Sequence, residues 1–374
     1  MWFFKRKNKN NEIDMSSTAH SAYVSSLKDK AFANYLSPVQ VDKILENIKD
    51  FDFIDDEIKK EMQFPDLNYL IEKLMPSNLI PNKIRRNISP KDVLKATCLG
   101  DIIGSKYEFS VHDYNAVKTE LLPPERASFT DDSVLSIASM LAILENPENP
   151  DFRQAYINGY KKYPSAGYGS AFVGWACNER MFYVENMEND KIDNSKGYHS
   201  FGDGCAMRIP FIAAYYENIE DVIKYTIKSV MTTHDHVESI KASLVLSIAI
   251  WMLLHNYSKD EVFEYCKEHY CCSSKELENN MYKWSYYHLD TDPSQLDNKE
   301  SNASLFANYT VPYAIKCFYS TNSFDECMRL ILSHFGDTDT TCAIAGTLCY
   351  ACYGETGYNT DEILSKQNIL KYFE

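Results

Sequence analysis

The segment HFGDTDTTCAIAG, residues 334–346, joins an oxygen-rich turn to an apolar run of small residues. The apolar half predicts a buried helix, and Asp337 and Asp339 alternate with threonines at its start. Asp and Thr are good helix N-caps, because their side-chain oxygens accept hydrogen bonds from the unpaired N–H groups of the first turn. One cap needs only one such residue. The surplus of oxygens therefore indicates a further role.

A second segment of the same kind is SFTDDSV, residues 128–134, where Thr130, Asp131 and Asp132 precede an apolar helical run. Either segment alone is typical of an ordinary cap, with acids placed favourably at the positive end of the helix dipole. The two together favour a shared site for a hard cation, since carboxylate and hydroxyl oxygens suit Mg²⁺, Ca²⁺ or Mn²⁺ rather than zinc. Carboxylates gathered in this way would repel one another unless a metal ion neutralised them.

Three further motifs each leave two interpretations open. GDIIGSKYE, residues 100–108, predicts either a helix that ends in a glycine turn or a site that Asp101 supports and to which Glu108 adds a carboxylate. GYHSFGDGCAMR, residues 197–208, is either a plain turn or a loop whose backbone N–H groups hold a diphosphate. The two histidines of THDHVE, residues 233–238, are either ligand contacts or part of a helix cap.

The composition excludes several classes of protein. The formal net charge of −15 argues against a nucleic-acid partner, since phosphate backbones are bound through clustered Lys and Arg. The most apolar run, residues 242–254, is too short to span a bilayer and predicts a core helix. The start, MWFFKRKNKN, has its apolar and basic parts in the wrong order for a signal peptide. With 11 scattered cysteines, interpreted as buried free thiols, these features predict a cytoplasmic protein away from membranes.

Helical periodicity dominates the chain and predicts an all-α protein, with function in the loops between helices. Ser-Pro pairs at 37–38 and 89–90 are typical of an N-cap followed by proline at the first helical position. We predict an N-terminal extension over residues 1–87, consisting of a mobile tail and helices, and one domain over residues 88–374.

Together these motifs resemble the ADP-ribosylglycohydrolase family, which includes dinitrogenase reductase-activating glycohydrolase, from about residue 89 to about residue 358. The matching segments, in order, are GDIIGSKYEF, FTDDSV, GYGSAFVGWA, SFGDGCAMRIP, THDHVESIKA, TVPYAIKCF and GDTDTTCAIAG. The resemblance implies a compact, orthogonal all-α domain with two Mg²⁺ ions at its centre, or Mn²⁺ as an alternative. It also implies hydrolysis of the N- or O-glycosidic bond that joins ADP-ribose to a modified target.

The resemblance assigns roles to individual residues. The implied metal ligands are Thr130, Asp131, Asp132, Asp337, Asp339 and Thr340. The implied catalytic carboxylates are Glu108, Asp131, Asp132 and Asp339, with Asp101 in a supporting position. The implied contacts with ADP-ribose are Tyr168, Gly169, Ser170, Gly202, Asp203, Gly204, Cys205, Met207 and His234.

The chain departs from the family pattern at two positions of interest. Asp203 replaces the Asn of the usual S-F-G-N-G loop, which places a carboxylate near a predicted diphosphate. Phe335 replaces the usual Gly before GDTDT and is expected to narrow the site.

The expected substrate is an ADP-ribosylated protein, with arginine as the first linkage to test and a monomer as the expected state. Serine, a nucleobase or a small molecule are alternative linkages. The competing hypothesis is an ADP-ribose-binding or structural protein on the same fold that has lost catalysis, because fold alone does not establish function.

Overall fold

The structure is a computed structural model, and it describes residues 83–110, 112–178, 197–198, 200–270, 287, 289–295 and 305–374. Within these ranges the chain is helical, as predicted, and extended pairing is confined to an isolated bridge between Gly202 and Phe306. The α-helices are α6 (Pro90–Ser105), α7 (Asp131–Glu145), α8 (Phe152–Lys162), α9 (Ser170–Cys177), α10 (Pro210–Tyr215), α11 (Ile219–Val230), α12 (Val237–Leu254), α13 (Lys259–Tyr270), α15 (Ala307–Ser320), α16 (Phe324–Leu332), α17 (Thr338–Tyr353) and α18 (Thr360–Lys366). Short 3₁₀ turns are η2 (Ala116–Lys118), η3 (Asp203–Cys205), η5 (Pro293–Gln295) and η7 (Leu370–Tyr372).

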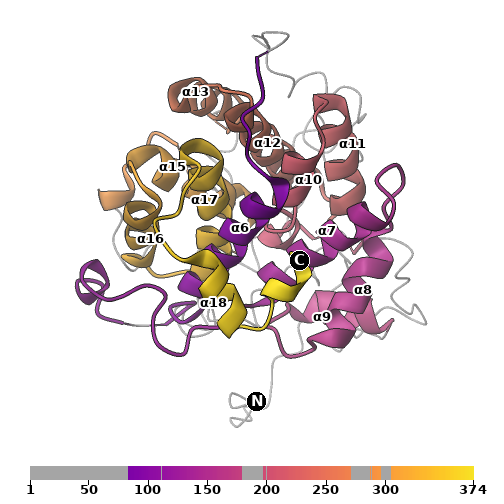
Figure 1. Cartoon of the computed structure of the whole chain (residues 1–374), viewed down its shortest axis with the longest axis horizontal. Coiled ribbons are helices and arrows are strands. Elements are labelled where there is room, and N and C mark those ends of the chain that lie inside the picture. Colours follow the sequence, from indigo (N-terminus) through magenta and orange to yellow (C-terminus); the bar gives the residue numbers. More distant parts are fainter. Residues whose placement is uncertain are drawn as a thin grey trace, which may run out of the picture.

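Helices α6 and α17 pack against each other at the centre of the domain (Figure 1). Their backbones come very close at Gly100 and Gly104, where a β-carbon would overlap backbone atoms of Cys342 and Thr338. Only glycine permits this approach, since it has no side chain. Helix α6 does end within the motif of residues 100–108, at Ser105, but its C-cap is Lys106 in the right-handed conformation, so neither glycine forms the terminating turn. The contact brings the middle of α6 against the start of α17.

Helix α12 contains the predicted core segment and packs against α10, α11, α15 and α17. Leu244, Val245 and Ile248 are fully buried, which confirms the core helix. Among the described residues, no helix combines the length and apolarity that crossing a membrane requires.

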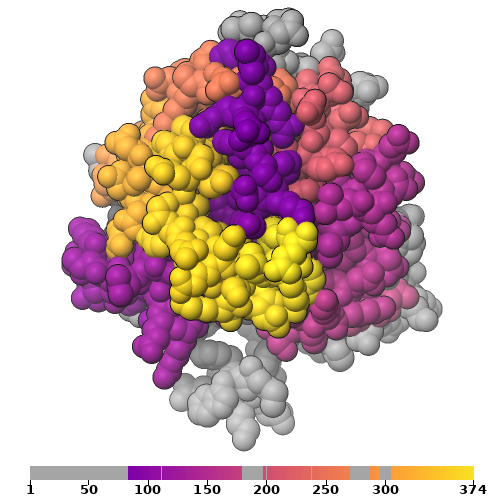
Figure 2. Space-filling view, viewed as in Figure 1, coloured from indigo at the N-terminus to yellow at the C-terminus, as the bar shows by residue number. Residues whose placement is uncertain are grey.

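The start of the described chain lies beside its C-terminal segment, as the indigo and yellow surfaces of Figure 2 show. Lys91 Nζ donates a hydrogen bond to the carbonyl of Phe373 at 2.7 Å, and Arg86 Nη1 donates to the carbonyl of Ala351 at 2.5 Å. Proline is at the first position of α6, as predicted, although the Ser89 side chain makes no capping hydrogen bond. These contacts join the two ends of the domain.

Most of the predicted extension, including the Ser-Pro pair at 37–38, lies outside the described residues. Its last residues pack on the domain, since Arg85 Nη2 donates a hydrogen bond to the carbonyl of Ala214. The boundary between residues 87 and 88 stays a prediction.

Candidate active site

Two helix starts meet at the centre of the domain, and each contains one of the two oxygen-rich segments. Helix α7 begins at Asp131, and the side chain of its N-cap, Thr130, accepts a hydrogen bond from the Asp132 amide at 3.3 Å. Asp337 occupies the N-cap position of α17, but its side chain makes no capping hydrogen bond. Capping therefore explains Thr130 and does not explain Asp337.

Carboxylates from four parts of the chain gather around these helix starts. Asp101, Asp132 and Asp339 each have an oxygen within 4.8 Å of the other two. Glu108, Asp337 and Asp339 form a second group of the same dimensions. Asp339 belongs to both, so the groups are continuous. The four aspartates are buried, whereas Glu108 is half-buried.

Asp101 of α6 holds the first turn of α7 in place. Its carboxylate accepts hydrogen bonds from the Thr130 amide at 2.9 Å and the Thr130 hydroxyl at 2.8 Å. It also accepts from the Ser133 amide at 3.1 Å and from the Ser133 hydroxyl. Both Asp101 oxygens are thus already used by protein donors. This arrangement agrees with the supporting position expected for Asp101.

The threonines that begin α17 divide into two kinds. The Thr338 hydroxyl donates to a carbonyl of α6 at 2.8 Å, and the Thr341 hydroxyl donates to the Asp337 carbonyl at 2.6 Å. The Thr340 hydroxyl instead donates to Asp132 Oδ2 at 3.2 Å, across the gap between α17 and α7. The surplus of oxygens in the sequence therefore includes two threonines that hold the backbone and one that faces the carboxylates.

Burial and mutual repulsion make the cluster basic. Burial raises the pKa of Asp132 well above its usual range, and the negative charges of Asp339 and Asp101 raise it further. Burial also raises the pKa of Asp101 to about 6, despite its four hydrogen bonds. Such a cluster binds protons or cations tightly. Among the described residues no donor reaches Asp132 Oδ1, so this buried carboxylate oxygen lacks a hydrogen-bond partner in the protein. The residues therefore fit a hard divalent cation.

A cavity of about 110 Å³ adjoins the carboxylates. Its lining includes these predicted site residues: Asp131, Asp132, Gly169, Ser170, Gly202, Asp203, Gly204, Met207, His234, Asp337 and Thr340. The cavity is smaller than most ligand pockets, so ADP-ribose would occupy it only in part. A larger cavity of about 660 Å³ lies between α7, α8 and the C-terminal segment, and its lining contains none of the predicted site residues. We therefore assign the site by its chemistry rather than by its volume.

Two polar groups of the loop around η3 already form hydrogen bonds within the protein. The Gly202 amide donates to Ser200 Oγ at 3.1 Å, so this N–H group is not open as the sequence suggested. The Asp203 carboxylate is buried and accepts a hydrogen bond from the Thr310 hydroxyl of α15 at 2.7 Å. A β-carbon at Gly204 would lie 3.6 Å from the His234 ring, which is ordinary van der Waals contact, so this part of the loop lies directly against His234.

Two predicted ADP-ribose contacts do not line the cavity. The Tyr168 ring stacks on Phe172 with 5.1 Å between centroids, and its buried hydroxyl has no hydrogen-bond partner among the described residues. The Cys205 thiol is fully buried and points to α12, where it accepts a hydrogen bond from the Ser243 hydroxyl at 3.3 Å. In this structure the side chains of Tyr168 and Cys205 support the cavity wall.

The two histidines of the 233–238 motif have different positions. His236 is the N-cap of α12, where its Nδ1 accepts from the Glu238 amide at 3.2 Å. His234 is buried and lines the cavity. His236 thus caps a helix, whereas His234 lines the cavity and its contact with a ligand stays a prediction.

The segment that contains Glu108 is fixed on both sides. The Phe109 amide donates to the carbonyl of Gly336 at 2.9 Å, and the Phe109 ring meets the Phe335 ring edge-to-face at 5.9 Å. Phe335 is buried in this contact and does not line the cavity, so we find no narrowing of the cavity by its ring. Its position beside Phe109 instead joins the turn before α17 to the Glu108 segment.

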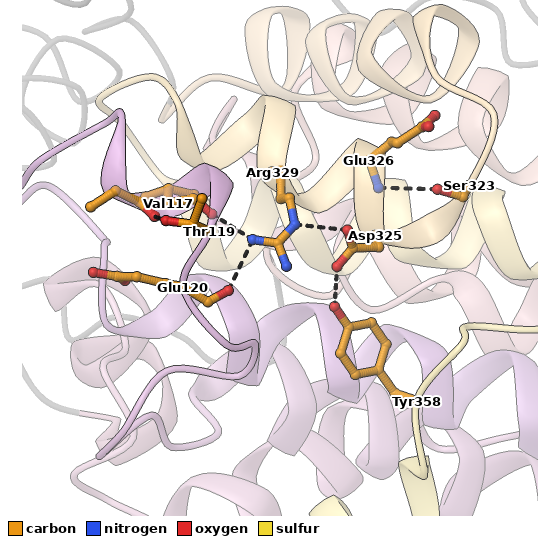
Figure 3. Close-up of polar contacts among 9 residues, drawn as sticks. Val117, Thr119, Glu120, Ser323, Asp325, Glu326, Arg329 and Tyr358 are labelled. Carbon is orange, nitrogen blue, oxygen red and sulfur yellow. Dashed lines mark hydrogen bonds and ion pairs between the residues drawn. The ribbon is translucent and has the colours of Figure 1, made fainter.

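Arg329 of α16 anchors the part of the chain that follows Glu108, at Val117 and Glu120 (Figure 3). Its Nη1 donates to the carbonyls of Val117 and Glu120 at 2.5 and 3.0 Å, and its Nε donates to Asp325 at 2.7 Å. The Tyr107 hydroxyl, one residue before Glu108, donates to the Glu120 carboxylate. The anchor therefore extends through Glu120 to the backbone beside Glu108.

Seven residues that line the cavity were not predicted as ligand contacts: Leu135, Ala171, Phe172, Tyr198, Ser200, Arg208 and Leu305. Arg208 is fully buried, and its Nε and Nη1 atoms have no hydrogen-bond partner among the described residues. The sequence signal for Arg208 was its place at the end of the GDGCAMR motif. Leu305 gave no signal, since it lies about a hundred residues along the chain from this loop.

These features define an all-α protein, over the residues described, with an acidic, all-oxygen centre at the junction of two helix starts. Comparison with known proteins agrees, because the ADP-ribosylglycohydrolase family model matches residues 91–362. The chain belongs to the ADP-ribosylglycohydrolase family and is an ADP-ribosyl hydrolase.

Several curated proteins are similar over most of the chain. It is 26% identical over 313 residues to ADP-ribosylhydrolase ARH3 of Mus musculus, which covers 70% of this chain and 82% of the relative. The Homo sapiens ARH3 is 26% identical over 310 residues, covering 70% and 84%. A putative ADP-ribosyl glycohydrolase L543 of Acanthamoeba polyphaga mimivirus is 21% identical over 319 residues, covering 75% and 92%. A solved ADP-ribosylglycohydrolase-related protein complex has the same fold, with a TM-score of 0.53 at 18% identity, covering 76% of this chain and 95% of that chain.

Proposed function

We propose that this hydrolase is metal-dependent and releases ADP-ribose from a modified protein by cleaving an N- or O-glycosidic bond. The observation that carries the proposal is the convergence of Asp132, Asp339 and Glu108 beside a cavity that the 202–204 loop also lines. Family membership supports the reaction class, whereas metal dependence rests on the buried oxygen cluster.

The metal ligands that we propose come from the two helix starts: Thr130, Asp131, Asp132, Asp337, Asp339 and Thr340. The buried, donor-free Oδ1 of Asp132 supports this assignment, as do the raised pKa values of Asp132 and Asp101. Two Mg²⁺ ions are proposed, with Mn²⁺ as the alternative. Such ions supply Lewis-acid polarisation and lower the pKa of water.

Among the catalytic carboxylates, Glu108 is the one we assign to proton transfer. Asp132 and Asp339 are buried and directed into the cluster, whereas Glu108 is half-buried beside Asp337 and Asp339. Its position lets it accept a proton from attacking water or give one to the leaving group, provided that it lies within hydrogen-bond reach of that atom. Asp131, Asp132 and Asp339 would hold the reacting atoms in position.

ADP-ribose is proposed to contact the cavity residues predicted from the family motif, namely Gly169, Ser170, Gly202, Asp203, Gly204, Met207 and His234. Tyr168 and the backbone of Cys205 complete the proposed surface. The curated relatives carry the name ADP-ribosylhydrolase, which does not specify a linkage. We keep arginine as the first linkage to test, with serine, nucleobase and small-molecule linkages as alternatives.

The test is a turnover panel of ADP-ribosylated arginine, serine and nucleic-acid substrates, with Mg²⁺ and with EDTA. Mg²⁺-dependent release of ADP-ribose from one class would support the proposal and identify the linkage. Asp339→Ala serves as the inactive control. Equal release in Mg²⁺ and in EDTA would refute metal dependence, and release by Asp339→Ala at the wild-type rate would refute the site.

A further inference from the structure

A chain of hydrogen bonds runs from a buried arginine to the cavity. Arg208 is fully buried and stacks over the Tyr156 ring, with 4.2 Å from guanidinium carbon to ring centroid. Its Nη2 donates to the Ser229 carbonyl at 3.0 Å and to Thr233 Oγ1 at 2.6 Å. The Thr233 oxygen lies 2.7 Å from His234 Nδ1.

Donor chemistry fixes the direction of the first hydrogen bond in this chain. A guanidinium has donors and no acceptor, so Thr233 Oγ1 must accept from Arg208. The single hydroxyl hydrogen of Thr233 is then available to His234 Nδ1, which lies 2.7 Å away. The Tyr198 side chain also lies within hydrogen-bond reach of the Thr233 side chain, and the proposed direction requires Tyr198 to donate there, so that the Thr233 hydrogen serves His234. An imidazole that accepts at Nδ1 carries its hydrogen at Nε2.

We propose that Arg208 and Thr233 are positioning residues that fix His234 in the Nε2–H tautomer, so that His234 presents a hydrogen-bond donor to the cavity beside Gly202 and Gly204. His234 lines the cavity, and a β-carbon built at Gly204 would lie 3.6 Å from its Nε2. Burial, together with the Arg208 charge, lowers the pKa of His234 well below its usual range, which keeps the ring neutral.

The ligand group that fits this donor is an oxygen acceptor, such as a phosphate or ribose oxygen placed at the 202–204 loop. This part of the inference rests on the proposed function, in which ADP-ribose occupies the cavity. The tautomer itself depends only on the protein. The two statements can therefore be tested separately.

The first experiment measures the tautomer without substrate. Long-range ¹H–¹⁵N spectra of the full-length, ¹⁵N-histidine-labelled protein report which ring nitrogen carries hydrogen, and the His234 signals are identified by their loss in His234→Gln. We expect the Nε2–H pattern in wild type and in Thr233→Ser, and its partial or complete loss in Thr233→Val, which keeps the side-chain shape but has no hydroxyl. An Nδ1–H pattern in the wild type, or an unchanged pattern in Thr233→Val, would overturn the inference.

The second experiment measures ADP-ribose affinity by calorimetry at saturating Mg²⁺. Loss of one oriented hydrogen bond predicts affinity about 5- to 10-fold lower in Thr233→Val than in Thr233→Ser. His234→Gln, whose amide can reach the position of Nε2, should bind more tightly than His234→Asn, whose amide can reach only the position of Nδ1. The reverse order would overturn the donor role. If wild type binds no ADP-ribose, the proposed function fails while the spectra still decide the tautomer.

Discussion

The Asp101 carboxylate of α6 accepts hydrogen bonds from both the amide and the hydroxyl of Thr130, at 2.9 and 2.8 Å. Thr130 is the N-cap of α7 and a proposed metal ligand. Asp101 of α6 thus sets the position of Thr130, the proposed metal ligand at the start of α7. The close contact of α6 with α17 also places Asp101 beside Asp339.

Asp101→Asn should weaken metal binding while the fold stays cooperative. An amide has one acceptor oxygen, so it cannot serve the donors that now occupy both carboxylate oxygens. Residues that orient metal ligands typically contribute ~10- to 100-fold to metal affinity, and we expect a loss in this range for Mg²⁺ measured by calorimetry. Asp92→Asn, on the half-exposed face of α6, is the matched control. Wild-type Mg²⁺ affinity in Asp101→Asn would contradict the supporting role.

The stability gained from Mg²⁺ should increase with pH between 5.5 and 7.5. Carboxyls whose folded-state pKa lies above the unfolded value make the metal-free protein least stable above that pKa, and more stable as pH falls through it. For Asp101 this window lies around pH 6 and below, and burial also raises the pKa of Asp132 well above its usual range. Metal binding requires the deprotonated forms and so has the opposite pH dependence.

Thermal unfolding in Mg²⁺ and in EDTA at several pH values checks this prediction. At a metal concentration 100 times the Kd, binding adds about 2.7 kcal/mol to stability. The difference in Tm between Mg²⁺ and EDTA should be small at pH 5.5 and large at pH 7.5, and Asp339→Asn should remove most of it. A difference that does not change with pH would argue against buried carboxylate ligands.

Asp131→Ala and Asp339→Ala should each abolish hydrolysis with little effect on cooperative unfolding. Asp131 lines the cavity at the first position of α7, and Asp339 belongs to both carboxylate groups. Loss of one ligand misplaces the ion and typically lowers activity by at least ~10- to 100-fold. Rates of ADP-ribose release and calorimetric unfolding of each variant test this prediction. A wild-type rate in either variant would show that its substituted residue is not part of the site.

The sequence predicted those parts of the site that depend on local pattern. The oxygen-rich helix starts, the all-α fold and the core helix α12 follow from periodicity and capping chemistry within short windows. The roles of Gly100 and Gly104 could not be predicted in this way, because the space that requires glycine is occupied by α17, far along the chain.

The dependence on distant segments also explains why the sequence did not predict the roles of the α17 threonines or the partner of Asp203. Local chemistry makes Thr338, Thr340 and Thr341 equivalent, whereas only Thr340 faces Asp132 once the helix phase is fixed. Asp203 finds its partner, Thr310, on a helix about a hundred residues away. Partners that come from distant segments carry no signal in a short window of sequence.

Arg329→Met should loosen the segment that follows Glu108 more than it destabilises the domain. The substitution removes the donors to the carbonyls of Val117 and Glu120 and to Asp325 (Figure 3). With the side chain partly exposed, we expect a loss of stability of about 1–2 kcal/mol. Hydrogen exchange of residues 112–120 should accelerate, and Arg329→Lys, which keeps the charge and one donor group, should show a smaller change. Unchanged exchange in Arg329→Met would refute the anchor.

Asp203→Asn should strengthen ADP-ribose binding several-fold. The Asp203 carboxylate accepts from the Thr310 hydroxyl at 2.7 Å, and an asparagine oxygen can accept the same bond while the negative charge is lost. A carboxylate about 5 Å from a phosphate at an effective dielectric of 20 costs on the order of 3 kcal/mol before screening, and solvent and counter-ions reduce this to a fraction. The gain should therefore shrink as salt is raised. Thr310→Val is the control, because it removes the hydrogen bond but keeps the charge, and it should bring no gain. Calorimetric titration of ADP-ribose at two salt concentrations compares the three proteins. Unchanged or weaker binding by Asp203→Asn would show that the Asp203 charge does not oppose the ligand, and equal gains in both variants would attribute the effect to the loop's geometry instead.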